Sequence, residues 1–417
     1  MNCSEFEEIK EKYLNGELSA EQEREVERHL ESCPFCQELL DNLLNNGHTA
    51  EEGIPRDNLI NKVSNEIINE QKQKKILRFA RYKNRFSMAV FLILMFFVLN
   101  IVGNLLSSIF FNYGNEDSRL YKTQKTAAIL TESCFPNVTM PTMLIPSSIF
   151  FSRASWGDSS LEIKPYFATR GEFNLKKQIG KEEYSIGNLL VNHFLTFTET
   201  EWKWKNGSKE LYLYFYHPEQ MAGINADSLP INSEQIWDAM DKLPEGTVAE
   251  LGLSFWNSFS IEDVITMFKD YDLDITWYAI TTGFEGKLDE KEHPELLTAF
   301  NGVWGIPHLS HNMLKTNSVI RMDDSSIREE YFMDSMKFLV ENADVAKKIY
   351  RGNPRELCLT ERYEYLEEHG IQVYGVVVTG PVKELLKLKE LETVHSPALG
   401  EIKLWNWYNR NFQGTMY

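Results

Sequence analysis

The chain has 417 residues and a net charge of −18, with 61 acidic side chains against 43 basic ones. An acidic surface repels a phosphate backbone, so this balance argues against direct binding of DNA or RNA and suits a basic protein partner. The length exceeds that of a typical single domain, so several domains are expected.

The first 50 residues predict a small all-α head. Apolar residues at helical spacing indicate a first helix from Ser4 to Leu14, and Gly16 suits a left-handed cap beyond its end. Ser19 and Gln22 have the spacing of a capping box that opens a second helix. Pro34 is well placed at the first position of a third helix.

Four side chains in this head are candidate ligands for Zn²⁺. His29, Cys33 and Cys36 form an H-x3-C-x2-C pattern across the corner between the second and third helices, and Cys3 can supply a fourth ligand. Thiolates and imidazoles are the ligands of tetrahedral zinc sites. A head this small buries too little apolar surface to be stable alone, which favours a metal. The alternative is a surface histidine and unpaired cytosolic cysteines.

The same segment resembles the zinc-finger head of membrane anti-sigma factors, in which one histidine precedes two cysteines. The residues that carry the resemblance are Tyr13, Leu14, Gly16, Leu18, Ser19, His29, Leu30, Cys33 and Cys36. The resemblance implies a helical domain that grips a sigma factor of the extracytoplasmic-function type and keeps it from RNA polymerase.

Residues 51–87 predict a helical link. Leu59, Ile60, Val63 and Ile67 fall on one helical face. This stripe either packs back on the head or binds a partner protein in a groove, and in the family resembled this helix also contacts the sigma factor. Residues 71–87 carry seven lysines and arginines and no acid.

Residues 88–111 form an apolar run of 24 residues without a charge. About 20 helical residues cross a bilayer core, so the run predicts a single transmembrane helix, although a buried core helix is the alternative. Basic residues stay on the cytoplasmic side, so we expect a cytoplasmic N-terminus and an extracytoplasmic C-terminal part in the cell membrane.

A polar stripe interrupts this run. Asn100, Gly103, Asn104 and Ser107 fall within about one helical face. Small and amide residues at this spacing let membrane helices approach and hydrogen-bond one another. The stripe therefore predicts pairing with a second copy or with another membrane protein, unless it is merely tolerated.

Residues 112–240 predict a β-rich extracytoplasmic region, with a strand at Leu211–Tyr216. Residues 241–417 predict an α+β domain with a long helix at Ser325–Tyr350. Strand–helix–strand units at Thr247–Ile280 and Ile371–Trp407 suggest a ferredoxin-like fold. Cys134 and Cys358 are the only cysteines beyond the apolar run, where a disulfide is permitted, so pairing is left open.

Residues 240–410 resemble the C-terminal domain of Firmicute-type sigma regulators, through stretches such as VAELGLSF and YGVVVTGPVKELLKLKEL. This resemblance implies a regulatory domain, not an enzyme. We therefore expect a membrane anti-sigma factor that releases its sigma factor on an envelope signal. The alternative is a membrane sensor or scaffold whose zinc head recruits a different cytoplasmic protein.

Overall fold

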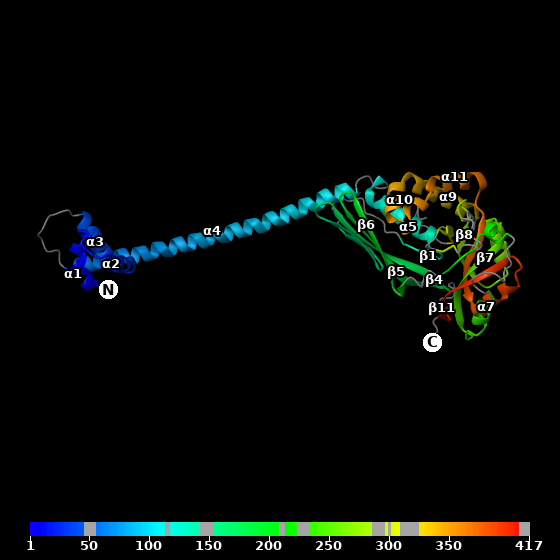
Figure 1. Cartoon of the computed structure of the whole chain (residues 1–417), viewed down its shortest axis with the longest axis horizontal. Coiled ribbons are helices and arrows are strands. Elements are labelled where there is room, and N and C mark those ends of the chain that lie inside the picture. The colour runs from blue at the N-terminus through cyan, green and yellow to red at the C-terminus, as the bar shows by residue number, and fades with distance from the viewer. Residues whose placement is uncertain are drawn as a thin grey trace, which may run out of the picture. The chain divides into compact units, whose positions relative to one another are not determined.

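The computed structural model describes residues 1–45, 56–112, 117–141, 153–207, 213–222, 233–285, 297–298, 302–308 and 325–407. The chain divides into two compact units, residues 1–97 and residues 98–417 (Figure 1).

The first unit is helical, as predicted. Its elements are α1 (Cys3–Leu14), α2 (Ala20–Ser32), α3 (Pro34–Asn45) and the start of α4 (Arg56–Asn112). Ser19 caps α2 in a capping box with Gln22, and Gly16 has a left-handed φ of 68° beyond the end of α1. The predicted caps of the head are therefore confirmed.

The helix α4 contains a segment, Arg78–Phe111, that is long and apolar enough to cross a membrane by length and composition. The stretch agrees with the predicted apolar run. Its side chains are mostly exposed, with 6% of the most apolar window buried, which is unlike the core helix of a water-soluble domain.

The second unit is α+β, with two antiparallel sheets in its described part (Figure 1). The first sheet has the order β2-β3-β4-β5-β6, with β1 paired to β4. Its strands are β1 (Val138–Thr139), β2 (Arg153–Trp156), β3 (Ser159–Lys164), β4 (Ala168–Ile179), β5 (Glu182–Phe194) and β6 (Phe197–Trp204).

The second sheet has the order β11-β7-β10-β8-β9. Its strands are β7 (Thr247–Phe259), β8 (Asp274–Ile280), β9 (Gly305–Pro307), β10 (Val373–Pro381) and β11 (Val394–Leu404). Both predicted strand–helix–strand units are present: β7-α8-β8, in which α8 is Ile261–Phe268, and β10-α12-β11, in which α12 is Val382–Leu386. They interleave in one sheet, because β10 lies between β7 and β8 and β7 lies between β10 and β11.

Helices cover both sheets. They are α5 (Arg119–Cys134), α6 (Pro218–Met221), α7 (Ser233–Asp241), α8 (Ile261–Phe268), α9 (Ser325–Glu341), α10 (Ala343–Ile349), α11 (Leu359–His369) and α12 (Val382–Leu386), with the 3₁₀ turns η5 (Pro354–Glu356) and η6 (Lys387–Glu390).

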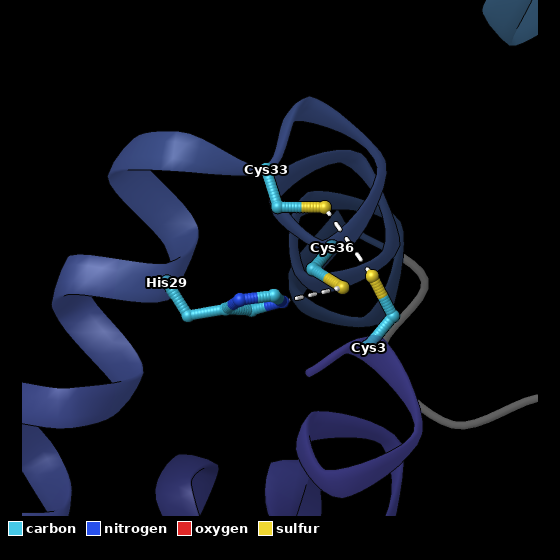
Figure 2. Close-up of side chains that lie close together, drawn as sticks. All are labelled: Cys3, His29, Cys33 and Cys36. Atoms are coloured by element: carbon cyan, nitrogen blue, oxygen red, sulfur yellow. Dashed lines mark hydrogen bonds between the residues drawn. The ribbon is translucent and has the colours of Figure 1, made fainter. Parts of the chain in front are cut away.

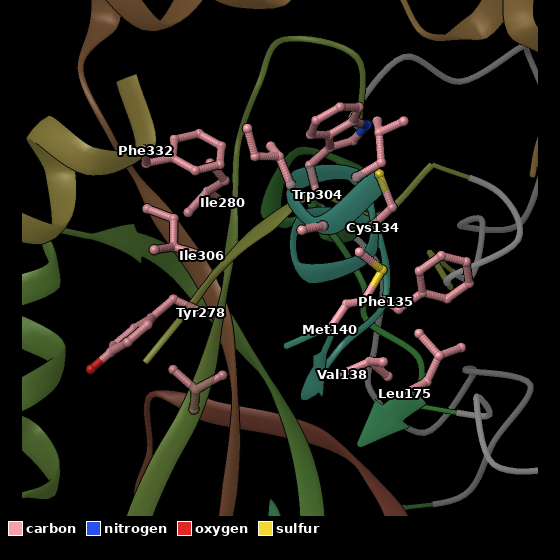
Figure 3. Close-up of a cluster of buried hydrophobic side chains, with 14 of the residues drawn as sticks. Cys134, Phe135, Val138, Met140, Leu175, Tyr278, Ile280, Trp304, Ile306 and Phe332 are labelled. Carbon is pink, nitrogen blue, oxygen red and sulfur yellow. The ribbon is translucent and has the colours of Figure 1, made fainter. Parts of the chain in front are cut away.

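The core joins the two sheets through α5, which the sequence pattern did not predict. Most of α5 is buried, and the Trp277 indole donates a 2.8 Å hydrogen bond to the carbonyl of Glu132 near its end. Figure 3 shows Cys134 beside Trp304 and Phe135 next to Met140, with Phe332 of α9 in the same cluster. A helix buried around most of its circumference has no amphipathic stripe for a sequence pattern to detect.

Two predictions for this unit need correction, and one pairing that was left open is decided. In the described part of Leu211–Tyr216 there is no strand: Phe215 forms an isolated bridge to Leu297, because the aromatic side chains there are buried between other elements. The long helix predicted at Ser325–Tyr350 breaks at Asn342, whose side-chain amide donates to the Phe338 carbonyl. The pairing left open for Cys134 and Cys358 is not formed, since both thiols are free.

Candidate metal centre

Three helices of the head bring the four predicted ligands together. Asn2 caps α1 in a capping box with Glu5, which sets Cys3 at the first position of that helix. His29 lies in the last turn of α2, and Cys33 ends that helix with an extended backbone. Cys36 follows in the first turn of α3. The corner between α2 and α3 therefore supplies three side chains, and the start of α1 supplies the fourth.

The ligand atoms converge on one point (Figure 2). The Cys3 and Cys33 sulfurs are 3.5 Å apart, and His29 Nε2 lies 3.3 Å from the Cys36 sulfur. All four atoms lie within 4.8 Å of one another. A tetrahedron with metal–ligand distances of about 2.0–2.3 Å has edges of about 3.3–3.8 Å, so the cluster suits a metal ion with little rearrangement.

The electrostatics of the thiols also fit a cation. Burial, followed by the neighbouring Cys3 and Cys33 thiols, raises the pKa of Cys36 to about 12. Burial opposes ionisation of Cys33 too, but hydrogen bonds from the Cys36 backbone and from neighbouring groups outweigh it and lower the pKa of Cys33. A bound cation would stabilise the thiolates against this mutual repulsion, and binding would release protons.

The core of the head is small, and the cluster is part of it. Among the described residues of the head, the fully buried apolar side chains are Phe6, Val26 and Cys36. The Phe6 ring lies 6.0 Å from the His29 imidazole. Few side chains are fully buried, so apolar burial alone gives the folded head little stability. A metal that crosslinks the three helices would add to that stability.

The other predicted site residues lie in α4. That helix contains Leu59, Ile60, Val63 and Ile67, whose side chains lie outside the described part of the structure. Whether they form a partner-binding stripe therefore stays a prediction.

Part of the polar stripe has a contact within this chain. A Cβ atom placed on Gly103 would lie 3.2 Å from Pro165, and Ser107 Oγ accepts a 2.8 Å hydrogen bond from the backbone N–H of Phe167. Asn100 and Asn104 are half-buried. The sequence did not predict the β3–β4 turn as a partner of the helix, because a Pro-Tyr-Phe turn has no pattern that indicates such a contact.

Two family models match this chain. Residues 3–37, which hold all four clustered side chains, match the model described as "Putative zinc-finger", and residues 240–401 match "Sigma factor regulator C-terminal". The "Probable anti-sigma-M factor YhdL" of Bacillus subtilis (strain 168) is 26% identical over 415 residues, which cover 98% of this chain and 100% of that protein. Together these matches support a zinc-finger anti-sigma factor.

The anti-sigma factor matches correspond to distinct parts of the structure. The zinc-finger match runs from the start of α1 into α3, and the regulator match runs from the end of α7 to β11. The segment that suits a membrane span, Arg78–Phe111, lies between them. No solved structure matches the chain.

Proposed function

We propose that this anti-sigma factor binds an extracytoplasmic-function sigma factor with a cytoplasmic zinc head and holds it at the membrane. The observation that carries the proposal is the convergence of Cys3, His29, Cys33 and Cys36 within the zinc-finger match. That head is joined through one apolar helix to a sigma-regulator domain.

The metal in this proposal is Zn²⁺, held by Cys3, His29, Cys33 and Cys36. Three thiolates and one imidazole are a donor set typical of closed structural zinc sites. With four protein ligands no position is left open for water or substrate, so the metal fixes the head and does no chemistry. This arrangement supports a regulatory, non-enzymatic role.

The sigma factor would contact the head and the first part of α4. Residues 1–70 carry 17 acidic side chains against 6 basic ones, which suits a basic, nucleic-acid-binding partner. Leu59, Ile60, Val63 and Ile67 would form the apolar face that enters a groove of that partner. The name of the Bacillus subtilis relative supports a sigma factor as the partner class.

The orientation follows from charge. The seven basic residues at 71–87 precede the apolar run and would stay on the cytoplasmic side with the zinc head. The part of the second unit from residue 112 onward would then be extracytoplasmic. Residues 51–87 would act as the link, 88–111 as the span, 112–240 as the β-rich region and 241–417 as the regulator domain.

The outer unit would receive an envelope signal. The order β11-β7-β10-β8, in which two strand–helix–strand units interleave antiparallel, supports a ferredoxin-like description of this sheet. A signal releases the sigma factor only if it favours the unbound state of the head over the bound state. Asn100, Gly103, Asn104 and Ser107 would also let the span pair with a second copy or another membrane protein.

Co-expression of the full-length chain with an extracytoplasmic-function sigma factor from the same genome tests the proposal. The chain should lower transcription from a promoter of that sigma factor and should co-purify with it in detergent. The Cys33→Ser variant should lose both effects, whereas Cys358→Ser, whose thiol lies outside the cluster, should keep them. Full repression by Cys33→Ser, or capture of a different cytoplasmic protein without repression, would reject the proposed role.

A further inference from the structure

One end of the first sheet carries exposed apolar side chains on two neighbouring turns. The turn between β3 and β4 and the turn between β5 and β6 are joined by a 2.8 Å hydrogen bond from the Leu195 N–H to the Phe167 carbonyl. Four side chains there are exposed by 39–73% and are called the tip patch: Tyr166, Phe194, Leu195 and Phe197. Large apolar side chains gathered on one exposed end mark a contact surface.

The backbone of these turns is unusual for such side chains. Tyr166, Phe167 and Leu195 have positive φ angles of 65°, 59° and 54°. Glycine or asparagine adopts this left-handed region at little cost, whereas a bulky residue pays about 1 kcal/mol or more. Tyr166 and Leu195 are exposed at positions where a small polar residue would be more stable and more soluble, which points to a binding role for their side chains.

The turns that carry the tip patch lie against the end of the membrane-spanning segment. Gly103 of α4 approaches Pro165, the ring centroids of Phe110 and Phe167 are 5.4 Å apart, and those of Phe111 and His193 are 5.9 Å apart. Figure 1 shows the β5–β6 end of the sheet beside the C-terminal end of α4. The patch is therefore fixed to helix positions that are themselves within the apolar run.

Helix geometry gives the depth of these positions. A 30 Å hydrocarbon core takes about 20 helical residues, and counted from Arg85, the last basic residue before the run, it ends at about residue 105. Gly103 and Ser107, the contacts of the β3–β4 turn, lie on either side of that level. A turn attached there lies at the boundary between acyl chains and headgroups.

Two exposed cations lie beside the patch. The Arg119 guanidinium lies 4.3 Å from the centre of the Phe110 ring, and Lys348 Nζ donates a 3.4 Å hydrogen bond to the Thr196 carbonyl. Burial, followed by the charges of Lys348 and Arg119, lowers the pKa of His193 to about 4, which places both cations near that ring. Aromatic side chains flanked by basic ones are typical of segments that sit at a membrane interface.

We propose that the tip patch inserts into the headgroup–acyl boundary of the bilayer that α4 crosses. Its occupant is the lipid surface itself, on the side where the span emerges. The inference rests on the proposed membrane placement, and it adds a second attachment that would fix the orientation of the outer unit on the membrane. Arg119 and Lys348 would face phosphate headgroups.

Quenching of an introduced tryptophan by brominated lipid tests this contact. The full-length Phe197→Trp variant is reconstituted into phosphatidylcholine–phosphatidylglycerol vesicles, with and without acyl-brominated phosphatidylcholine. Glu201→Trp is the matched control, because it is exposed on the same face of β6, four residues and about 13 Å from the tip. The fluorescence of the parent chain, with its nine native tryptophans, is subtracted.

Most of the fluorescence added by Phe197→Trp should be lost in brominated vesicles, and that added by Glu201→Trp should be retained. Flotation of the vesicles on a density gradient is measured first. A chain that does not float contradicts the membrane placement, and the inference with it. A chain that floats but shows no quenching at position 197, or equal quenching at both positions, overturns the tip contact while leaving the anti-sigma role intact.

Discussion

The backbone N–H of Phe167, in the turn between β3 and β4, donates a 2.8 Å hydrogen bond to the Oγ of Ser107 in α4. Ser107 is fully buried, and the Phe110 ring packs edge-on against the Phe167 ring in the same contact. The end of the span and the first sheet are thus one packed body. A change in the second unit can therefore bias the helix directly, without a separate linker, which is what the proposed relay through the membrane would require.

Replacing Ser107 by alanine should loosen this contact. The Phe167 N–H would lose its acceptor in a buried place, at a cost of about 1 kcal/mol. Amide hydrogen exchange in the peptide that contains Phe167 should become about fivefold faster in the full-length chain. Leu106→Ala, on the exposed face of the same helix turn, is the control and should leave that exchange unchanged. Equal acceleration in both variants would show that the hydrogen bond does not hold the turn.

The Cys33→Ser variant should lose the metal of the head. Cys33 lies 3.5 Å from Cys3 across the cluster, and a serine hydroxyl is a poor substitute for a thiolate zinc ligand. Zinc content should fall from about one ion per chain to about none. Because metal binding supplies folding free energy in such small domains, α1–α3 should also lose protection from hydrogen exchange.

The Cys358→Ser variant controls for the loss of any thiol, since Cys358 lies in the second unit and its thiol donates a hydrogen bond to the nearby Arg355 carbonyl. It should keep the zinc and the protection of the head. A Cys33→Ser protein that retains a full zinc complement would show that the ligand set is wrong.

The head was predictable because its signals are local. Each helix boundary depends on no more than four neighbouring residues: the capping pair Ser19–Gln22, the break at Gly16 and the start at Pro34. The H-x3-C-x2-C spacing then brings three candidate ligands to one corner. The position of Cys3 was a longer-range inference, and the structure brings its sulfur to the same point.

The second unit was predictable only in part, because its folding depends on long-range burial. Strands β7, β8 and β10 were predicted because their apolar residues alternate with polar ones or form a continuous run. Helix α5 was not predicted, because it is buried on most faces and has no apolar stripe on one side. The strongly apolar residues around Phe215 predicted a strand, but they are buried in a segment without regular secondary structure. Tyr166 and Phe167 are unlike turn residues in sequence, so neither the turn nor its contact with α4 could be foreseen.

A buried ion pair joins the two sheets, and breaking it should be costly. Lys177 of β4 lies 2.9 Å from Glu250 of β7, both are almost fully buried, and Glu250 also accepts a 2.7 Å hydrogen bond from Asn137. Lys177→Met should lower the free energy of unfolding by about 3–5 kcal/mol, because it leaves a buried carboxylate without its cation. Adding Glu250→Gln to that variant should recover part of the loss.

Denaturant unfolding followed by tryptophan fluorescence measures this effect, since all nine tryptophans lie between residues 156 and 407. Lys203→Met is the matched control, because Lys203 forms an exposed pair with Glu201, 3.4 Å away. Exposed pairs contribute about 0–1 kcal/mol, so this variant should unfold close to the parent. Similar losses in the two lysine variants would mean that the buried pair does not link the sheets energetically.

Acid should destabilise the second unit through His395. This imidazole is 6% exposed, its ring centroid lies 4.1 Å from the Trp256 ring, and its Nε2 has no hydrogen-bond partner among the described residues. Burial lowers the pKa of His395 from 6.5 to about 4, although the backbone of Phe255 acts in the other direction. The unfolded chain therefore takes up a proton below about pH 6.5, while the folded chain stays neutral until about pH 4.

Neutral His395 contributes to the free energy of unfolding. This contribution is fully present above pH 6.5 and falls as the pH drops towards 4, by about 3 kcal/mol at most. Tryptophan-monitored unfolding of the parent should show this loss, and His395→Gln should flatten the curve between pH 6.5 and 4. His369→Gln, at an exposed position of α11, should follow the parent. If His395→Gln keeps the full acid sensitivity of the parent, the proton that destabilises the fold binds elsewhere.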